Sequence, residues 1–468
     1  MNSNLQNKMF SEIADKAIFK QTQQYAFEYL DNIFERNVYP SDEALSNLSQ
    51  FDAELPTNST PATRVLEHLN RFGSPATNAT LGGRYFGFVN GSALPIGMAA
   101  KNLATFWDQC PAMNVLSPVG SKLESVVEKW LIQLFNLPKE SSAGFVSGTS
   151  MANLCSIAAA RCRILKKNGW DISRKGLYNA PRIRIVTGKH AHSTVLKAVA
   201  ILGLGKDCIE WVDVDKQGRI IPELIPQLDS NTILILQAGN VNGGSFDDFE
   251  RICKKANDVN AWVHIDGAFG LWAAASDKLK HLTKGIELAN SWAVDGHKTL
   301  NTPYDSGIVL CKDKEAMVES LHMSGSYIIR SKERDGMLYT PEMSRRSRII
   351  ELWAILKYLG TVGIDELIYT MHRRAKQFVD EVSEINGFYV ENDVVFNQII
   401  IRCENDQLTK NVLANIQSLR ECWLGGAVWH DKKVIRVSIC SWATTENDIT
   451  IAVGSFKKAL EMELQKGA

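Results

Sequence analysis

The chain has 468 residues, and its 52 Lys and Arg residues are balanced by 52 Asp and Glu residues. This length exceeds what one hydrophobic core usually holds, so two or three domains are expected. The zero net charge argues against nucleic acid as a partner, and the lack of an apolar run of about 20 residues argues against a membrane span.

The N-terminal segment, residues 1–75, is predicted to be mainly helical, because apolar residues recur at helical spacing in FSEIADKAIFKQTQQYAFEYLDNIF. It is polar and mixed in charge, unlike a secretory signal. The nine cysteines are scattered and form no CxxC pair, so neither a disulfide framework nor a zinc site is expected. This usage favours a cytoplasmic protein with reduced thiols and no bound metal.

Residues 76–345 are predicted to form one large α/β domain. Ser121 and Glu124, three residues apart, are interpreted as a capping box that opens a helix. Helical stretches such as 154–165 and 247–258 then alternate with short apolar runs. These runs are 183–186, 233–237, 262–265 and 308–311. The alternation predicts a mostly parallel sheet with helices on both faces.

Residues 346–468 are predicted to form a smaller α+β domain. A helix is expected to end near Gly360, followed by strands at 398–403 and 434–440 and by a terminal helix. The pair Gly425-Gly426 is interpreted as a turn.

The segment SGTSMAN (147–153) resembles a phosphate-binding loop in composition. Small residues at a helix start leave backbone N–H groups open to an anion, and the hydroxyls of Thr149 and Ser150 add donors. The segment is not a Walker sequence. A plain N-cap is the alternative interpretation.

His190 and His192 follow the apolar run 183–186. A histidine in this place either caps the next helix or contacts a ligand. A rival hypothesis joins them with His264 and Asp266 as the metal ligands of a hydrolase, because residues two apart in extended chain point the same way.

Asp266 and Lys298 each stand just after an apolar run. A buried carboxylate is costly without a partner. Asp266 therefore either caps a turn or is held for a protonated ring nitrogen, with the small Ala268 letting a flat group approach. Lys298, directly after His297, is either a surface charge or a buried amine whose pKa falls toward that needed for imine chemistry. A phosphate cradle, an aspartate, a histidine and a lysine together predict pyridoxal phosphate as cofactor.

Six motifs occur in a characteristic order between about Arg84 and residue 460. They are SGTSMAN (147–153), AHS (191–193), HIDGAFG (264–270), DGHKTLNTPYDSG (295–307), PEMSRRSR (341–348) and FNQIIIR (396–402). With them the chain resembles the group II pyridoxal-phosphate-dependent amino-acid decarboxylases, the family of aromatic-amino-acid, glutamate and diaminobutyrate decarboxylases. The resemblance implies fold type I, as in aspartate aminotransferases, with a mostly parallel seven-stranded sheet in the large domain.

The resemblance also implies a role for each matching residue. Lys298 would form the Schiff base, Asp266 would bind the pyridine nitrogen, and Ala268 and His192 would pack on opposite ring faces. The phosphate would be held by Thr149, Ser150 and His297. The implied protein is a homodimer with its active site at the interface and its N-terminal segment packed on the partner subunit.

The implied reaction is carboxy-lysis of an amino acid, through an external aldimine that loses CO2 and gives an amine. Three positions depart from the family pattern. Gly336 stands near the usual position of a loop tyrosine that protonates the product, so Tyr339 or Tyr327 would have to substitute. Thr299 replaces a common tryptophan. The loop after Gln237 lacks the usual threonines and offers Asn240 and Asn242 instead.

These departures leave two alternatives open. One is an aldehyde-forming oxidative deaminase or another lyase on the same scaffold, and the other is a cofactor-binding protein without turnover. Four arginines are candidate anchors for a substrate carboxylate or members of structural ion pairs. They are Arg345, Arg346, Arg348 and Arg436.

Overall fold

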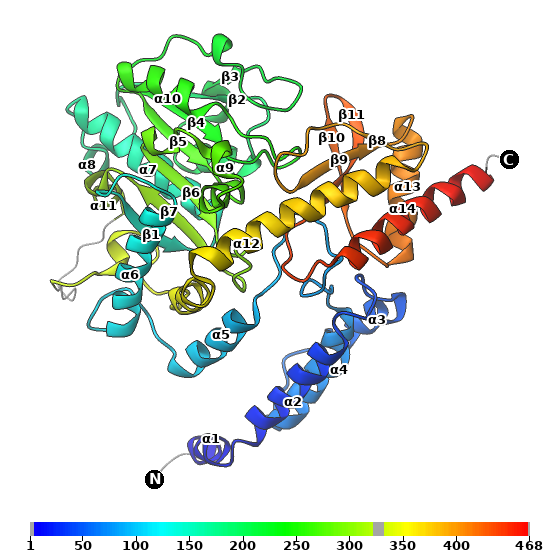
Figure 1. Ribbon diagram of the computed structural model, residues 1–468. Helices are drawn as coiled ribbons and strands as arrows, with labels where there is room; N and C mark the ends of the chain where they lie inside the picture. The colour runs from blue at the N-terminus through cyan, green and yellow to red at the C-terminus, as the bar shows by residue number, and fades with distance from the viewer. Residues whose placement is uncertain (1–3, 322–331, 467–468) are drawn as a thin grey trace.

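The computed structural model describes residues 4–321 and 332–466 (Figure 1). The chain begins with helices α1 (Asn4–Asp15), α2 (Ala17–Asn32), α3 (Asp42–Ser46) and α4 (Ala62–Gly73). Figure 1 shows these helices projecting from the rest of the molecule, with α2 and α4 side by side. The helical N-terminal segment predicted from periodicity is confirmed.

A seven-stranded sheet forms the centre of the large part. Its strands are β1 (Ser142–Val146), β2 (Arg184–Gly188), β3 (Ile209–Val212), β4 (Thr232–Gln237), β5 (Trp262–Asp266), β6 (Ser291–Asp295) and β7 (Gly307–Cys311). Their order is β1-β7-β6-β5-β4-β2-β3, and β7 runs antiparallel to both neighbours. The predicted mostly parallel sheet is confirmed. The pattern missed β1, which is built largely of small residues, and β3, an edge strand that leaves Trp211 exposed.

Both faces of the sheet are buried, which explains the continuous apolar runs. In β4, Ile233 and Ile235 pack toward α7 (Thr149–Lys167), α9 (Ser193–Ile201) and α11 (Lys314–Leu321). Leu234 and Leu236 pack on the opposite face. That face is covered by α6 (Pro118–Leu134), α10 (Phe249–Asp258) and the first half of α12 (Ile349–Ser383). The remaining helices of this region are α5 (Pro95–Trp107) and the short α8 (Ile172–Lys175).

The predicted capping box at Ser121 is wrong. Helix α6 begins at Pro118, and its N-cap is Ser117, four residues before Ser121. The Ser117 hydroxyl accepts a hydrogen bond from the Gly120 amide. Serine before proline is the stronger start signal, because the proline ring has the helical φ and needs no N–H partner. Ser121 lies inside the helix, and its hydroxyl donates to the Arg334 carbonyl at 2.5 Å.

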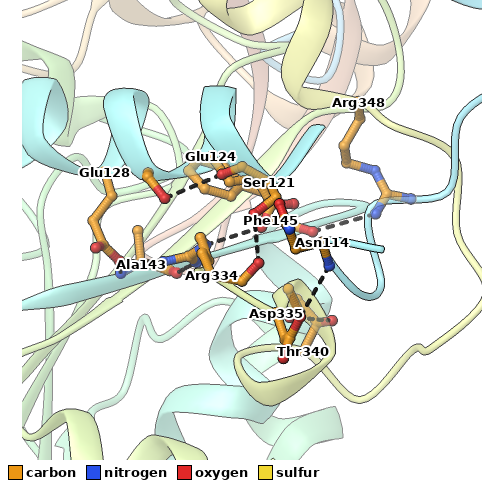
Figure 2. Close-up of polar contacts among 12 residues, drawn as sticks. Asn114, Ser121, Glu124, Glu128, Ala143, Phe145, Arg334, Asp335, Thr340 and Arg348 are labelled. Atoms are coloured by element: carbon orange, nitrogen blue, oxygen red, sulfur yellow. Dashed lines mark hydrogen bonds and ion pairs between the residues drawn. The ribbon is translucent and has the colours of Figure 1, made fainter. Parts of the chain in front are cut away.

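Glu124 is instead the centre of a buried ion cluster (Figure 2). Its two oxygens lie 3.0 Å from Arg334 Nε and 2.6 Å from Arg345 Nη2, and its side chain is fully buried. Arg334 also binds Glu128 at 2.7 Å and the Ala143 carbonyl. The cluster therefore ties the chain that follows residue 332 to helix α6 and strand β1.

Other helix limits also differ from the predictions. Helix α7 begins at Thr149, five residues before the predicted start, because Gly148 ends the preceding loop. Helix α10 is capped by Asp248, whereas the carboxylate of Asp247 accepts hydrogen bonds from two backbone amides. The helix end expected near Gly360 is confirmed, because the backbone of Gly360 is non-helical, with φ of 58° and ψ of −174°. Element α12 (Ile349–Ser383) therefore consists of two helices joined at Gly360.

The C-terminal part is a four-stranded antiparallel sheet in the order β10-β11-β9-β8 with helices beside it. Its elements are β8 (Tyr389–Val390), β9 (Gln398–Arg402), α13 (Asp406–Leu419), β10 (Gly425–Trp429), β11 (Lys432–Ser438) and α14 (Glu446–Lys466). The turn predicted at Gly425-Gly426 is wrong, because these residues begin β10. The hairpin turn lies at His430 and Asp431, whose φ angles are 45° and 64°.

None of the helices in the described ranges is long and apolar enough to cross a membrane. All nine cysteines are free thiols, and seven of them are buried.

Glu124→Gln is expected to lower the free energy of unfolding by roughly 3 kcal/mol, because it leaves Arg334 and Arg345 buried without their shared charge. Guanidinium denaturation followed by circular dichroism measures the change. The control is Glu140→Gln, since Glu140 is exposed and 3.9 Å from Lys312. Equal stability of the two variants would show that the cluster contributes little.

Candidate functional site

Two neighbouring strands end at one edge of the large sheet and bring the predicted residues together. Asp266, the last residue of β5, is paired with Ala293 of β6. Beyond the strand, the Asp295 amide donates to the Ala268 carbonyl at 2.9 Å. The loops 266–268 and 295–298, separate in sequence, are therefore hydrogen-bonded to each other.

The Asp266 carboxylate is 4% exposed and is held by two N–H donors. Oδ2 accepts from Asn153 Nδ2 at 3.1 Å, and Oδ1 accepts from the Ala268 amide at 3.2 Å. These donors offset part of the cost of burying the charge. The bond to Ala268 is the turn cap that the sequence offered as one interpretation, and it leaves the carboxylate in a position to accept a further proton donor.

Behind Asp266 lies a chain of buried hydrogen bonds. Asn153 Oδ1 is 2.9 Å from His264 Nε2, and His264 Nδ1 is 3.0 Å from the Ser291 hydroxyl, which also accepts from Trp262 Nε1 at 3.0 Å. Burial lowers the pKa of His264 to about 4, so the ring is neutral near pH 7. Both ring nitrogens are engaged. The rival metal site, which needs His264 as a ligand, is therefore not supported.

Lys298 lies beside Asp295, with Nζ 3.3 Å from Oδ2 and a side chain that is 19% exposed. The same oxygen is 3.6 Å from His297 Nε2. Burial, the largest cause, lowers the pKa of His297, and its Nδ1 accepts from the Ser306 amide at 3.1 Å. The ring of His297 also faces Tyr304, with centroids 4.4 Å apart.

The start of α7 has the features of an anion site. Gly148 precedes the helix and supplies no capping side chain, so the first N–H groups have no side-chain acceptor from that position. The buried hydroxyl of Thr149 has no hydrogen-bond partner in the described ranges, and Asp295 Oδ1 has none either. A phosphate at this helix end would satisfy the Thr149 hydroxyl. Ser150 is exposed at the same end.

His192 caps helix α9, as one of the two sequence interpretations proposed. Burial is the main cause that lowers its pKa, and the charges acting on it are those of Asp266, Lys298, Arg436 and Asp295. His192 therefore lies among the other predicted residues. His190 does not, because its ring contacts Trp429 at 5.0 Å and His430 at 5.3 Å.

Tyr339 is not brought to this group. It is 6% exposed and packs in the core near α11, with the Arg334 guanidinium 4.0 Å from its ring centroid. A side chain at Gly336 would collide with the Pro111 carbonyl and with Arg345. The other tyrosine considered, Tyr327, lies outside the described residues.

Three of the four candidate arginines are in ion pairs. Arg345 binds Glu124, Arg346 binds Asp305 and Glu351, and Arg348 binds Asp305. Arg436 differs, since no ion pair to it occurs among the described residues. Its Nη1 donates to the Val241 carbonyl at 3.2 Å and to Asn242 Oδ1 at 3.3 Å, and burial lowers its pKa.

Sequence reasoning gave no role to Asn153, Asp295 and Asn301. All three lie within quoted motifs, and Asp295 precedes Lys298 by three residues, so the motifs contained a signal that was not used. The fully buried Asn301 amide donates to the carbonyls of Lys298 and Cys440, both at 2.8 Å, and its oxygen accepts from the Trp442 amide at 2.7 Å.

A family model described as the pyridoxal-dependent decarboxylase conserved domain matches residues 46–404. An acidic amino acid decarboxylase of Mus musculus is 28% identical over 287 residues, which cover 58% of this chain and 51% of the mouse protein. An aromatic-L-amino-acid decarboxylase of Bacillus atrophaeus is 27% identical over 327 residues, covering 67% of this chain and 66% of that protein. The match thus spans about half to two thirds of these relatives.

Among solved structures, Oryza sativa TDC with PLP and tryptamine superposes with a TM-score of 0.88 at 19% identity. The match covers 97% of this chain and 98% of that one. This likeness shows a shared fold and confirms the predicted fold type I.

The His264→Gln variant is expected to be less sensitive to acid than the wild type. The unfolded ring protonates near 6.5 and the folded ring near 4, so lowering the pH from 7.5 to 5 favours unfolding by about 2 kcal/mol. Gln keeps an N–H donor for Asn153 but does not titrate.

Guanidinium denaturation of both proteins at the two pH values measures this difference. Asp247, whose pKa burial raises to about 6, titrates alike in both proteins and cancels. Parallel pH dependence of the two proteins would contradict the expectation.

Proposed function

Because the chain belongs to the pyridoxal-dependent decarboxylases, we propose that it is a carboxy-lyase that releases CO2 from an amino acid and forms an amine. Its cofactor is pyridoxal phosphate. The observation that carries the proposal is that Lys298, Asp266 and the start of α7 lie around one edge of the sheet, where the Thr149 hydroxyl is buried and has no hydrogen-bond partner among the described residues.

Each predicted residue has a task toward the cofactor. When bound, pyridoxal phosphate accepts the electron pair of the bond that breaks at the substrate α-carbon. Lys298 holds the cofactor through its ε-nitrogen, and Asp266 holds a proton on the ring nitrogen. Ala268 and His192 flank the ring. The phosphate is bound by Thr149, Ser150 and His297, at a helix end whose dipole favours an anion.

Arg436 binds a carboxylate of the substrate. It is a half-buried cation bonded only to neutral oxygens among the described residues, and its charge acts on His192. Because guanidinium pairs best with carboxylate, an anionic substrate group would supply the missing partner. The names of the two relatives, one acting on acidic and one on aromatic amino acids, are both compatible with this anchor.

The active unit is a homodimer in the cytoplasm. Large apolar side chains are exposed along the N-terminal helices and α5, and a monomer would leave them in water. They include Phe10, Phe27, Leu69, Leu103, Phe106 and Trp107. In this arrangement residues 1–75 pack on the partner subunit, residues 76–345 form the cofactor-binding domain, and residues 346–468 form the small domain.

An aldehyde-forming oxidative deamination is the second candidate. It is favoured by the lack of room for a side chain at Gly336 and by the burial of Tyr339 under Arg334. Without a tyrosine to protonate the α-carbon, dioxygen would take up the electron pair left by CO2 and be reduced to peroxide. Hydrolysis of the resulting imine would then release an aldehyde and ammonia. A cofactor-binding protein without turnover is the third.

Borohydride treatment of the purified protein is expected to fix a pyridoxyl label on Lys298 alone. Lys298→Arg, which keeps a positive charge beside Asp295 but cannot form an imine, should lose the visible absorption band and the label while its circular dichroism is unchanged. Lys189→Arg, on the exposed surface beyond β2, is the matched control. A label on any other residue would refute the lysine assignment.

Incubation with a panel of acidic and aromatic amino acids is expected to release CO2 and amine in equal amounts. Arg436→Gln should raise KM more than it lowers kcat if the arginine binds a substrate carboxylate in the ground state. If peroxide and ammonia form and no amine appears, the protein is an oxidative deaminase and the proposed decarboxylase activity is refuted. No product from any amino acid would favour the protein without turnover.

A further inference from the structure

Asn153 joins three groups at the site edge, of which Asp266 and His264 are buried and Thr194 is half-buried. Its Nδ2 lies 3.1 Å from Asp266 Oδ2 and 3.2 Å from the Thr194 hydroxyl, and its Oδ1 lies 2.9 Å from His264 Nε2. An ionised carboxylate only accepts hydrogen bonds, so the amide NH2 must face Asp266. The opposite orientation would place two oxygens against each other. The orientation of this amide, and hence every bond it makes, is therefore determined.

The direction of the next hydrogen bonds follows from that orientation. Because Asn153 donates to the Thr194 hydroxyl, the hydroxyl proton is free to donate to His192 Nδ1, 2.8 Å away. The backbone amide of Thr194 also donates to Nδ1, at 3.3 Å, in the N-cap of α9. An amide N–H needs a lone pair as its acceptor. His192 Nδ1 therefore carries no proton.

From this we propose that Asn153 and Thr194 are positioning residues that fix His192 as the neutral tautomer with its proton on Nε2. In this tautomer Nδ1 is occupied by the N-cap of α9, and the other ring nitrogen, Nε2, can donate a hydrogen bond but cannot accept a proton. The tautomer follows from the hydrogen bonds alone. Its use, as an uncharged donor on the face of a bound cofactor, rests on the proposed function.

Burial of the ring and the N-terminus of α9 also favour the neutral form of His192. The N-terminus of α9 disfavours a positive charge at its cap. Lys298 and Arg436 oppose protonation of His192, whereas Asp266 and Asp295 favour it. Burial is the largest influence and lowers the pKa of His192. Protonating Nδ1 would in addition break both hydrogen bonds from Thr194.

The same amide also connects His192 with Asp266, since Asn153 donates to Asp266 directly and to His192 through Thr194. Both of these side chains therefore depend on Asn153, a fully buried side chain of α7. Replacing Thr194 distinguishes these two connections, because it removes the link from Asn153 to His192 and leaves the direct bond from Asn153 to Asp266.

Nitrogen-15 NMR of the full chain labelled at histidine tests the proposal, with His192→Gln used to assign the resonances. The wild type is expected to show a lone-pair resonance for Nδ1 and a protonated resonance for Nε2 near neutral pH. Spectra are recorded before and after loading with pyridoxal phosphate. A protonated Nδ1 in the wild type would overturn the proposal, whatever the variants do.

Thr194→Val removes the hydroxyl but keeps the shape, the backbone donor and the Asn153–Asp266 bond. It is expected to raise the proton affinity of His192 about tenfold, and Thr194→Ser should restore the wild-type spectrum. Thr232→Val, at a buried threonine of β4, is the control for general loss of packing and should leave His192 unchanged. A wild-type His192 signal in Thr194→Val would show that the hydroxyl plays no part.

This result is independent of the labelling of Lys298 by borohydride. A fixed tautomer with no label on Lys298 would refute the proposed function and leave the positioning role. A label on Lys298 together with a mixture of His192 tautomers would support the proposed function and refute the positioning role.

Discussion

The charge of Asp266 is the constraint on which the site is built. Its carboxylate is 4% exposed, and the protein interior tolerates it because N–H groups from α7 and from its own loop point at it. The donor on α7, Asn153, is held in turn by His264, which lies on β5 two residues before Asp266. Helix α7 must therefore cross the sheet in one register, and that register also places the Thr149 end of the helix beside Asp295.

Parallel strands supply the second part of the geometry. Because β5 and β6 run the same way, their following loops leave the sheet at the same edge, where ligands of such sheets bind. The reactive side chains come from these loops and from the two helix starts beside them. The sheet itself contributes rigidity, since alternate residues of each central strand are buried on both faces.

The C-terminal part reaches the site through Asn301. This residue binds the carbonyl of Lys298 on one side and the chain after β11 on the other, through Cys440 and Trp442. Arg436 lies on β11, and its charge acts on His192. The small sheet is therefore linked both to the backbone of Lys298, through Asn301, and to the proposed substrate anchor.

The amino-acid sequence by itself determined the class of fold and the residues at the strand ends. Apolar runs, turn residues and short motifs are local, and they placed Asp266, Lys298, His192 and Thr149 at one edge of a mostly parallel sheet. Local signals failed where competing ones lay close by, as at Ser117 and Ser121, or where a glycine pair began a strand rather than a turn.

Only the tertiary structure decided the hydrogen-bond partners. Asn153 and Asp266 are 113 residues apart, and Glu124 and Arg345 are 221 apart, so no spacing in the sequence predicts either contact. The same holds for the burial of Tyr339 beneath Arg334 and for the crowding at Gly336. Such contacts depend on how whole helices cross the sheet. The positions of these helices are determined by side-chain packing on both faces of the sheet at the same time.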